Sequence, residues 1–476
     1  MQHDPPPGLR ALEARLAESL ERLQEPATDW VPPTFAPDGS TALDVAILGA
    51  GMAGLAAGFA LKRDGVLRVA LFDPAPEGEE GPWATYARMR TLRSPKQLAG
   101  PALSLPDLTF RAWHEAQHGA AGFAALGKIP TLMWMDYLRW YRRVSGLDIR
   151  SGVAVTLIEP DDALFRLRLS DGATVFARYV VLATGRDGLG GPRLLPGFAP
   201  EWRGALWAHS ADAVEFAALA GKHVVVIGAG ASAFDNAAEA LEAGCGRLTM
   251  LLRRAALPRV NSGKALEGRG IWHGWHDLPS EWRWRLALAV ERRQTPPPHE
   301  SVRRVAAHAH ATLLTGAGIE AVARDGDALL LTTPRGKYRA DFTILGTGFL
   351  QDAVLRPELA IIAGQIRLWR DAYAPPEAER DATLGLNPWL DDAFAFTERM
   401  PGTAPHLARL HCLNFAATLS HGKLTGDIPA ISAGAQKLAR GICARLLAAD
   451  IVHHAARHAA FDEPEITGDE WPGVAL

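Results

Sequence analysis

The stretch from Leu43 to Asp73, LDVAILGAGMAGLAAGFALKRDGVLRVALFD, places a glycine-rich turn between two short apolar runs. The first run is typical of a buried parallel strand, and the second ends at Asp73. The turn at 49–54, Gly-Ala-Gly-Met-Ala-Gly, opens a helix that we expect to end near Lys62. This order of strand, turn, helix, strand and acid predicts a βαβ unit that binds a dinucleotide.

Each glycine of this turn has its own predicted purpose. Gly49 allows the tight turn, Gly51 lets the backbone approach a pyrophosphate, and Gly54 lets the helix pack close to the strand. The free N–H groups of the helix N-terminus face the phosphates, and Asp73 meets the ribose hydroxyls. The alternatives are a turn that only packs, or a membrane span over the apolar residues 45–61, which is short for a span. The predicted contacts are Gly49, Gly51, Met52, Ala53, Gly54 and Asp73.

The composition is that of an ordinary globular protein. The chain has 476 residues, 48% apolar and 22% charged, which allows two or three domains. The net charge of -3 gives no general reason to expect nucleic acid or an anionic membrane as a partner. The three cysteines, Cys245, Cys412 and Cys443, are far apart, which argues against a disulfide framework or a zinc site. We expect a cytoplasmic protein with no membrane span and no metal.

The opening pattern recurs in the middle of the chain. A strand at 224–227 leads into the turn Gly-Ala-Gly-Ala-Ser-Ala at 228–233, and the next strand, 248–252, ends at Arg253-Arg254. The guanidinium groups at this position can hold a 2′-phosphate, whereas a carboxylate would repel it, so we expect NADPH rather than NADH. The alternative for the two arginines is a solvated strand end. The predicted contacts are Gly228, Gly230, Ala231, Ser232, Ala233, Arg253 and Arg254.

The two fingerprints predict an α/β fold with two nested Rossmann-like domains and a helical insert. Alternating runs at 152–182 indicate a β-meander that returns to the first sheet. Two similar turns, Ala-Thr-Gly at 183–185 and Gly-Thr-Gly at 346–348, each follow a buried strand. The predicted divisions are 1–40, a helix and proline-rich linker; 41–215, the first part of the first domain; 216–345, the second domain; and 346–476, the rest of the first domain with C-terminal helices.

Four cations fall within nine residues after the first unit: Arg88, Arg90, Arg93 and Lys96. Loops beyond the carboxyl ends of parallel strands line the ligand crevice of such folds. This run is therefore a candidate pocket for an anionic group of a substrate. The alternatives are a solvated face or pairing with cofactor phosphates.

The insert at 258–310 is longer than a normal connection and is rich in tryptophan, so a lid or a substrate-binding role is plausible. We expect Trp282 and Trp284 to pack. His308 and His310 are two apart in a helical run, so we expect them to point apart and not to bind metal.

From about 43 to 445, these motifs resemble the flavoprotein monooxygenases with two dinucleotide sites. That group contains the flavin-containing monooxygenases, the Baeyer–Villiger enzymes and the amino-acid N-hydroxylases. The resemblance implies FAD at 49–54 with Asp73, and NADPH at 228–235, where Ser232 and Asp235 match. The segment 426–428 looks like the one beneath the flavin pyrimidine. The further cofactor contacts expected are Trp83, Val155, Thr184, Gly185, Gly348, Gly426, Asp427 and Ile428.

Two departures from the group matter. Its aromatic-x-Gly-x3-His signature appears here as Trp202-x-Gly204-x4-His209, one residue too long. In addition, the run Thr-Leu-Arg-Ser-Pro at 91–95 carries Arg93 where flavin-containing monooxygenases often have asparagine, and is similar to a run in amino-acid N-hydroxylases.

The resemblance implies that NADPH reduces FAD, which then reacts with O2 to give a C4a-hydroperoxide. Since the cations at 88–96 could hold a carboxylate, we expect N-hydroxylation of a small amine or amino acid. The predicted partners are a small-molecule substrate and O2, with a possible homo-oligomer. The alternatives are Baeyer–Villiger or sulfide oxygenation, an FAD-linked NADPH oxidase or reductase, and a nucleotide-binding protein without activity. The predicted catalytic residues are Arg93, Lys96, Asn414 and His421.

Overall fold

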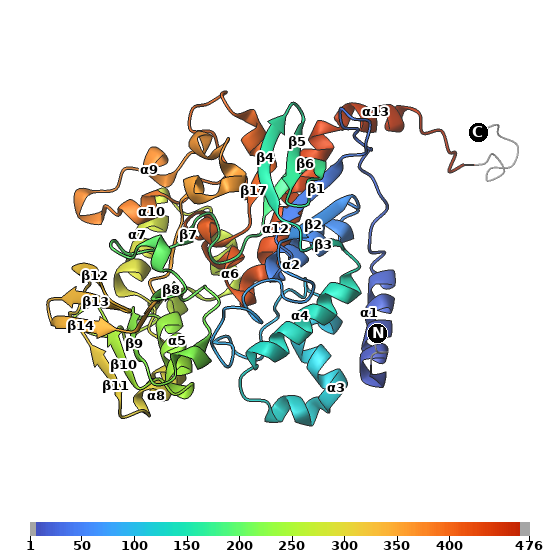
Figure 1. Cartoon of the computed structure of the whole chain (residues 1–476). Helices are drawn as coiled ribbons and strands as arrows, with labels where there is room; N and C mark the ends of the chain where they lie inside the picture. Colours follow the sequence, from blue (N-terminus) through green and yellow to red (C-terminus); the bar gives the residue numbers. More distant parts are fainter. Residues whose placement is uncertain (1–5, 467–476) are drawn as a thin grey trace, which may run out of the picture.

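A computed structural model describes residues 6–466 and contains two main sheets, one mixed and one parallel, each associated with helices (Figure 1). The predicted α/β fold class with two dinucleotide-binding units is confirmed. The first sheet has the order β3-β2-β1-β6-β5-β4, and β17 also pairs with β6. Its strands are β1 (Leu43–Leu48), β2 (Val69–Asp73), β3 (Asp148–Ser151), β4 (Val155–Asp161), β5 (Leu164–Leu169), β6 (Thr174–Leu182) and β17 (Leu410–Cys412).

The first sheet is built from two distant parts of the chain. Strands β1, β2, β3 and β17 run parallel to their neighbours, while β4, β5 and the first half of β6 form the predicted antiparallel meander. β17 adds to the second half of β6, and α12 (Ile431–Ala449) packs against α2 (Met52–Arg63). The C-terminal part therefore returns to complete the first unit.

The second sheet is wholly parallel and has the order β11-β10-β9-β15-β8. β8 lies before residue 216, so this sheet takes a strand from the segment that we assigned to the first domain. Its strands are β8 (Trp207–His209), β9 (His223–Ile227), β10 (Arg247–Leu251), β11 (Ala311–Leu314) and β15 (Phe342–Leu345). The smaller sheets contain β12 (Ala321–Asp325), β13 (Ala328–Thr333) and β14 (Gly336–Ala340), and the pair β7 (Gly191–Pro192) and β16 (Phe349–Leu350).

The helices cover both units. α1 (Pro7–Arg22) buries Leu9, Leu12 and Leu16 and packs on α3, so it docks on the first unit. α5 (Ala231–Glu242) follows the second glycine turn and packs against β9 and β10. The remaining α-helices are α3 (Phe110–Ala125), α4 (Thr131–Ser145), α6 (Arg269–Gly274), α7 (Ser280–Arg293), α8 (His299–Ala306), α9 (Trp369–Ala372), α10 (Ala382–Gly385), α11 (Thr418–His421) and α13 (Ile451–Ala459).

The insert is helical, and its parts pack on different partners. Trp284 of α7 is buried with Trp369 and Leu419 of the C-terminal part, whereas α8 packs on α5. Trp282 differs from expectation because its side chain is 52% exposed on the outer face of α7.

The prediction that the two insert histidines point apart was wrong. α8 ends at Ala306, so His308 and His310 lie in a turn, and their ring centroids are 5.5 Å apart. No group of three or more metal-ligating side chains occurs within residues 6–466. In the same part of the chain, no helix has the length and apolar character needed to cross a membrane.

Candidate active site

The first glycine turn is shaped partly by the protein and partly for a ligand. Gly49 has φ +104°, and a Cβ there would lie 2.5 Å from the Ala183 oxygen. A Cβ on Gly54 would lie 1.9 Å from the Gly49 oxygen, so both positions need glycine for packing. A Cβ on Gly51 would meet its nearest protein atom at 3.7 Å, an ordinary contact. The backbone at Gly51 is therefore open to a ligand, as a pyrophosphate site requires.

In the second glycine turn, too, one glycine is required for packing and another leaves the backbone open. Gly228 has φ +135°, and a Cβ there would lie 2.3 Å from the Gly346 oxygen. A Cβ on Gly230 would meet no protein atom within 4 Å. Ala233 replaces the third glycine, and its methyl group packs against Gly346, where a Cβ would clash at 2.6 Å. Gly346, in the turn after β15, therefore leaves the space that the Ala233 methyl group fills. Both glycine turns have the open backbone that a dinucleotide phosphate requires.

Asp73 at the end of β2 is buried and engaged by backbone. One carboxylate oxygen accepts a hydrogen bond from the Ala50 N–H at 2.8 Å and the other from the Ala75 N–H at 2.9 Å. The carboxylate therefore holds the first turn in shape. Its contact with a ribose stays a prediction.

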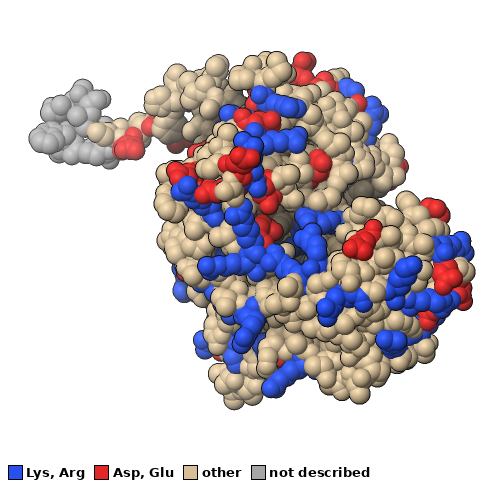
Figure 2. Space-filling model, turned by 90° about the vertical axis from the view of Figure 1, so that its left-hand side faces the viewer, with Lys and Arg blue, Asp and Glu red and all other residues tan. Residues whose placement is uncertain are grey.

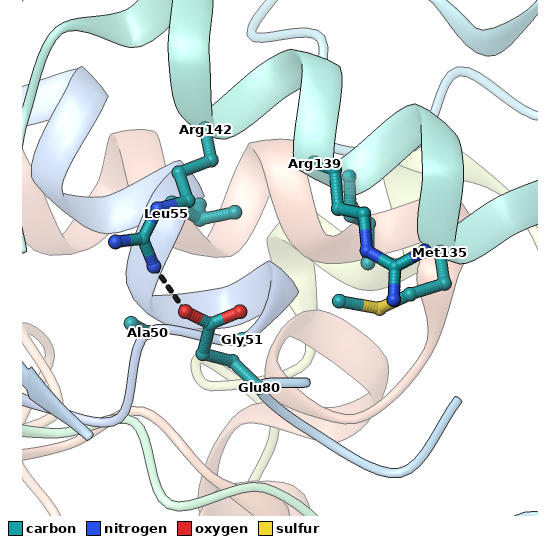
Figure 3. Close-up of a pocket in the computed structure, with 8 residues that line it drawn as sticks. Ala50, Gly51, Leu55, Glu80, Met135, Arg139 and Arg142 are labelled. Carbon is teal, nitrogen blue, oxygen red and sulfur yellow. Dashed lines mark hydrogen bonds and ion pairs between the residues drawn. The ribbon is translucent and has the colours of Figure 1, made fainter. Parts of the chain in front are cut away.

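A small pocket beside Gly51 contains an acid and a cation that the sequence analysis missed (Figure 3). Glu80 is buried, forms an ion pair with Arg142 of α4, and accepts from the Gly78 N–H at 2.9 Å. Figure 3 shows the guanidinium of Arg142 pointing toward the Glu80 carboxylate. Glu80 lies in a loop without a motif, so only its position beside the turn marks it.

Asn414 does not have the environment predicted for a catalytic residue. It is fully buried, and its Nδ2 donates to the Leu182 oxygen at 3.3 Å and to the Thr184 hydroxyl at 3.1 Å. Its Oδ1 accepts from the Ala416 N–H at 3.0 Å. The amide is used inside the protein, so Asn414 fixes the C-terminal segment to the turn after β6 and positions Thr184 and Gly185.

His421 is also enclosed by protein. Its Nε2 lies 2.8 Å from the Asp391 oxygen, its ring stacks on His276 at 4.6 Å, and Phe394 lies 3.9 Å away. Burial lowers the pKa of His421 well below its ordinary value, so the ring is neutral. This arrangement joins the insert to the C-terminal part and gives no support to the predicted contact with a flavin.

Lys96 caps a helix instead of facing a substrate. Its Nζ donates to the carbonyl oxygens of Phe123 at 2.7 Å and Ala124 at 3.0 Å, and to that of Leu126. An ammonium group has three donors. All three are therefore used at the C-terminal end of α3, where a cation is favourable, and this argues against the predicted catalytic role.

The other cations of the run at 88–96 join the two units. Arg90 pairs with Glu242 at 2.6 Å, and Arg93 lies 3.6 Å from Asp235. Arg88 donates to the backbone oxygen of Asp212 at 3.3 Å. These three contacts, which we name the interdomain clasp, favour a pairing role for the run over an anion pocket. Their partners, however, are protein groups and not the predicted phosphates.

The two arginines after β10 have different environments. Arg254 donates to the Arg292 oxygen at 2.8 Å and so caps the end of α7. Arg253 is exposed, and within residues 6–466 its guanidinium makes no hydrogen bond or ion pair. Of this pair, only Arg253 has its donors available for the predicted phosphate.

The remaining predicted contacts lie around the strand-end turns and the start of α12. His209 is buried at the end of β8, with Nε2 3.0 Å from the Gly348 oxygen. The Thr425 hydroxyl donates to the backbone oxygen of Asn414 at 2.7 Å, which ties the start of the segment 426–428 to the turn at 183–185. Trp83 packs edge-on against Trp134, and Val155 begins β4 beside the first core.

Arg186 is exposed just beyond the carboxyl end of β6, and Tyr86, Glu291 and Asp427 lie near enough to act on its guanidinium; we name the region of these four residues the cleft. Solvent reaches Arg186, yet the surrounding protein lowers the pKa of its guanidinium by desolvation, and the other three groups act on it electrostatically. Figure 2 shows the face on the left of Figure 1, where Lys and Arg side chains border a hollow. The sequence analysis missed this cleft because its residues come from four separate segments.

Comparison with known proteins agrees with this geometry. A pyridine nucleotide-disulphide oxidoreductase family matches residues 46–265. The chain is 40% identical over 471 residues, 98% of both chains, to the FAD-dependent urate hydroxylase of Xanthomonas campestris pv. campestris. Ornithine hydroxylase of Pseudomonas aeruginosa has TM-score 0.66 at 17% identity, covering 85% of this chain and 100% of that one. L-lysine 6-monooxygenase of Pseudomonas syringae has TM-score 0.64 at 19% identity, covering 86% and 99%.

The two structural matches show a shared fold, and the urate hydroxylase match shows kinship along the whole chain. The predicted family is therefore confirmed: the chain belongs to the class B flavin monooxygenases and is a flavin-dependent oxidoreductase.

Proposed function

We propose that this enzyme is an FAD- and NADPH-dependent hydroxylase whose substrate is urate or a closely related planar oxopurine. The observation that carries the proposal is the 40% identity over 98% of both chains to an FAD-dependent urate hydroxylase. The match spans both dinucleotide units, the insert and the C-terminal part. In the balanced reaction, NADPH gives two electrons, one oxygen atom of O2 enters the substrate as a hydroxyl group, and the other leaves as water.

FAD occupies the first unit, and NADPH the second. Gly51 and Gly230 support these sites because each leaves open backbone at the start of a helix, where N–H groups and the helix dipole favour a phosphate. Arg253 supports NADPH over NADH because its guanidinium is exposed at the end of β10. The reduced flavin supplies the activated oxygen; the protein binds, orients and shields the reactants.

The charge of the cleft suits such a substrate. Urate is a planar anion at neutral pH, with several carbonyl oxygens that accept hydrogen bonds. The Arg186 guanidinium presents donors in one plane, and Arg193 and Arg254 act on nearby Glu291. The exposed Arg186 guanidinium, which makes no hydrogen bond or ion pair within residues 6–466, favours a flat, oxygen-rich anion over an uncharged ketone or sulfide.

A second candidate is N-hydroxylation of a small amine or amino acid. The shared fold with ornithine and lysine hydroxylases, and Arg93 at its place in the run 91–95, favour this activity. The cations at 88–96 give N-hydroxylation less support than the sequence suggested. Arg90 and Arg93 contact acids of the second unit, and Lys96 caps α3, so these side chains do not form a free pocket for a carboxylate. Baeyer–Villiger or sulfide oxygenation and an NADPH oxidase are the further alternatives.

A substrate panel separates these activities. The FAD-loaded enzyme is incubated with NADPH and, separately, urate, ornithine, lysine, a sulfide or a ketone, in buffer equilibrated with heavy-isotope O2. We expect urate to raise the rate of NADPH oxidation by about tenfold or more and to give a product carrying one labelled oxygen atom. A labelled hydroxylamine from an amine, with no product from urate, would reject the proposal in favour of N-hydroxylation.

A further inference from the structure

We propose that Arg186 is the residue that binds the negative charge of the substrate, holding a flat anion in the cleft between the two units. The inference rests on the proposed function, because it assigns a substrate contact to the same site. It also extends that function, since neither the glycine fingerprints nor the motifs of the sequence analysis include Arg186. The observations that carry it are the position of the side chain, its contact with Phe415 and its lack of a protein partner.

Arg186 lies where substrates of this kind of fold bind. It follows Thr184 and Gly185 directly after β6, a central strand of the first sheet. Ligands of open α/β sheets bind beyond the carboxyl ends of the strands. The segment 426–428, the predicted floor of the flavin site, is tied to the same turn through Asn414, which bonds both Thr184 and Thr425.

Phe415 holds the guanidinium in a fixed orientation. The Arg186 Cζ lies 4.2 Å from the centroid of the Phe415 ring, a cation–π contact. The Phe415 N–H donates to the Gly185 oxygen at 3.2 Å, and a Cβ on Gly426 would lie 3.2 Å from the Phe415 ring. The backbone of Phe415 is therefore held by the turn and its ring packs on Gly426, and the planar guanidinium of Arg186 lies over this ring with its donors unused.

Within the described residues, the Arg186 guanidinium makes no direct polar contact with another side chain or with the backbone. Within residues 6–466, Arg186 donates no hydrogen bond and forms no ion pair. Asp427, Glu291 and Tyr86 come from three different segments and act on it only at a distance, and Asp427 lies 3.6 Å from Lys423. These unused donors are open to solvent and available to an anion, because hydrogen bonds between a guanidinium and a charged acceptor are stronger than neutral ones.

The cofactor phosphates have other donors. The first turn and the start of α2 face one pyrophosphate, and the second turn with Arg253 faces the other phosphates. Arg186 belongs to neither set. A flat anion with paired oxygen atoms, such as a carboxylate or the edge of an oxopurine, matches the forked donors of a stacked guanidinium.

The test uses the FAD-loaded enzyme and benzoate, a flat monoanion that does not react. Binding is followed by the change in flavin absorbance, and the KM for urate is measured in parallel. We expect R186M to weaken benzoate binding and raise the KM for urate by about 10- to 100-fold, the range for losing hydrogen bonds to a charged group. R186K keeps the positive charge but lacks the planar, paired donors of a guanidinium, so its affinity for benzoate should lie between those of R186M and the wild type.

R166M is the matched control, because Arg166 also stacks on an aromatic ring, that of Phe176 at 5.5 Å, on a strand of the meander. It should match the wild type in both measurements. Unchanged benzoate binding in R186M, no benzoate response in the wild type, or a raised KM for NADPH alone would each overturn the inference. If benzoate binding depends on Arg186 but urate is not hydroxylated, the proposed function fails while the anion site stands.

Discussion

Arg93 of the first unit lies 3.6 Å from Asp235 of α5 in the second unit, across the junction between the two dinucleotide sites. Asp235 is buried and also accepts a hydrogen bond from the Ser301 hydroxyl at 2.5 Å. The helix that follows the second glycine turn is thereby tied to the run at 91–95 of the first unit. The interdomain clasp thus links the relative placement of the two cofactor sites to side chains that touch neither fingerprint.

The clasp predicts which kinetic constant changes in an Arg93→Ala variant. Because Arg93 contacts α5, we expect the KM for NADPH to rise about threefold or more while the KM for substrate stays within about twofold. Arg111→Ala is the control, since Arg111 forms an exposed pair with Glu115 away from the junction. A raised substrate KM with unchanged NADPH kinetics would instead support the original assignment of Arg93 as a substrate contact.

The middle glycine of the second turn allows binding and folding to be separated. A methyl group on Gly230 meets no protein atom within 4 Å, so Gly230→Ala should keep the melting temperature of the cofactor-free protein. The same methyl group would stand where a pyrophosphate approaches, so the KM for NADPH should rise about tenfold. Gly364→Ala, equally free of contacts, is the control. A destabilised Gly230→Ala protein would show that this glycine serves packing.

Arg253 predicts coenzyme preference. Arg253→Gln should raise the KM for NADPH by about tenfold and leave the KM for NADH unchanged, because only NADPH carries the 2′-phosphate. Arg247→Gln at the opposite end of β10 is the matched control and should change neither constant. Equal effects on both coenzymes would remove Arg253 from the phosphate site.

Asp44 predicts a pH dependence of stability. It is fully buried in β1, and although Arg68 lies 3.1 Å away, burial raises its pKa to about 6 from 3.8. Between these two values the folded protein keeps a proton that the unfolded chain has released. The protonated carboxyl therefore stabilises the folded protein at low pH, and this contribution is lost as the pH rises through about 6. The free energy of unfolding falls by about 3 kcal/mol as a result.

Asp44→Asn should remove this contribution. Comparing the free energies of unfolding of the two proteins at pH 4 and pH 7 isolates it from all other titrating groups. We expect the wild type to lose more stability than the variant over this interval. Equal losses would mean that the carboxyl titrates normally in the folded state.

The fold could be predicted because its signals are local. Glycine spacing and apolar runs around 49–54 and 228–233 fix two βαβ units, and the meander at 152–182 shows alternating side chains. Their order along the chain then gives the nested arrangement. We predicted that the second domain begins at residue 216, after β8, although β8 belongs to the second sheet. This strand is only three residues long and has no periodic pattern of its own.

The roles of single side chains depend on partners far away in the sequence. Lys96 bonds the end of α3, and Asn414 bonds Leu182, 232 residues away. Their residue types suggested catalytic roles, whereas the structure gives them structural ones. Arg186 was missed for the opposite reason. It follows a recognisable Thr-Gly turn, but only the three-dimensional structure shows that it lies over Phe415 and that no acid among residues 6–466 contacts it directly.

The measurement that tests the central claim most directly is the stoichiometry of a single reaction with urate. FAD-loaded enzyme, limiting NADPH, urate and heavy-isotope O2 are combined, and NADPH, urate, labelled product and hydrogen peroxide are all quantified. A urate hydroxylase should consume one urate and insert one labelled oxygen atom for each NADPH oxidised, with little hydrogen peroxide. Oxidation of NADPH at a rate that urate does not change, with the oxygen recovered as hydrogen peroxide, would contradict the account.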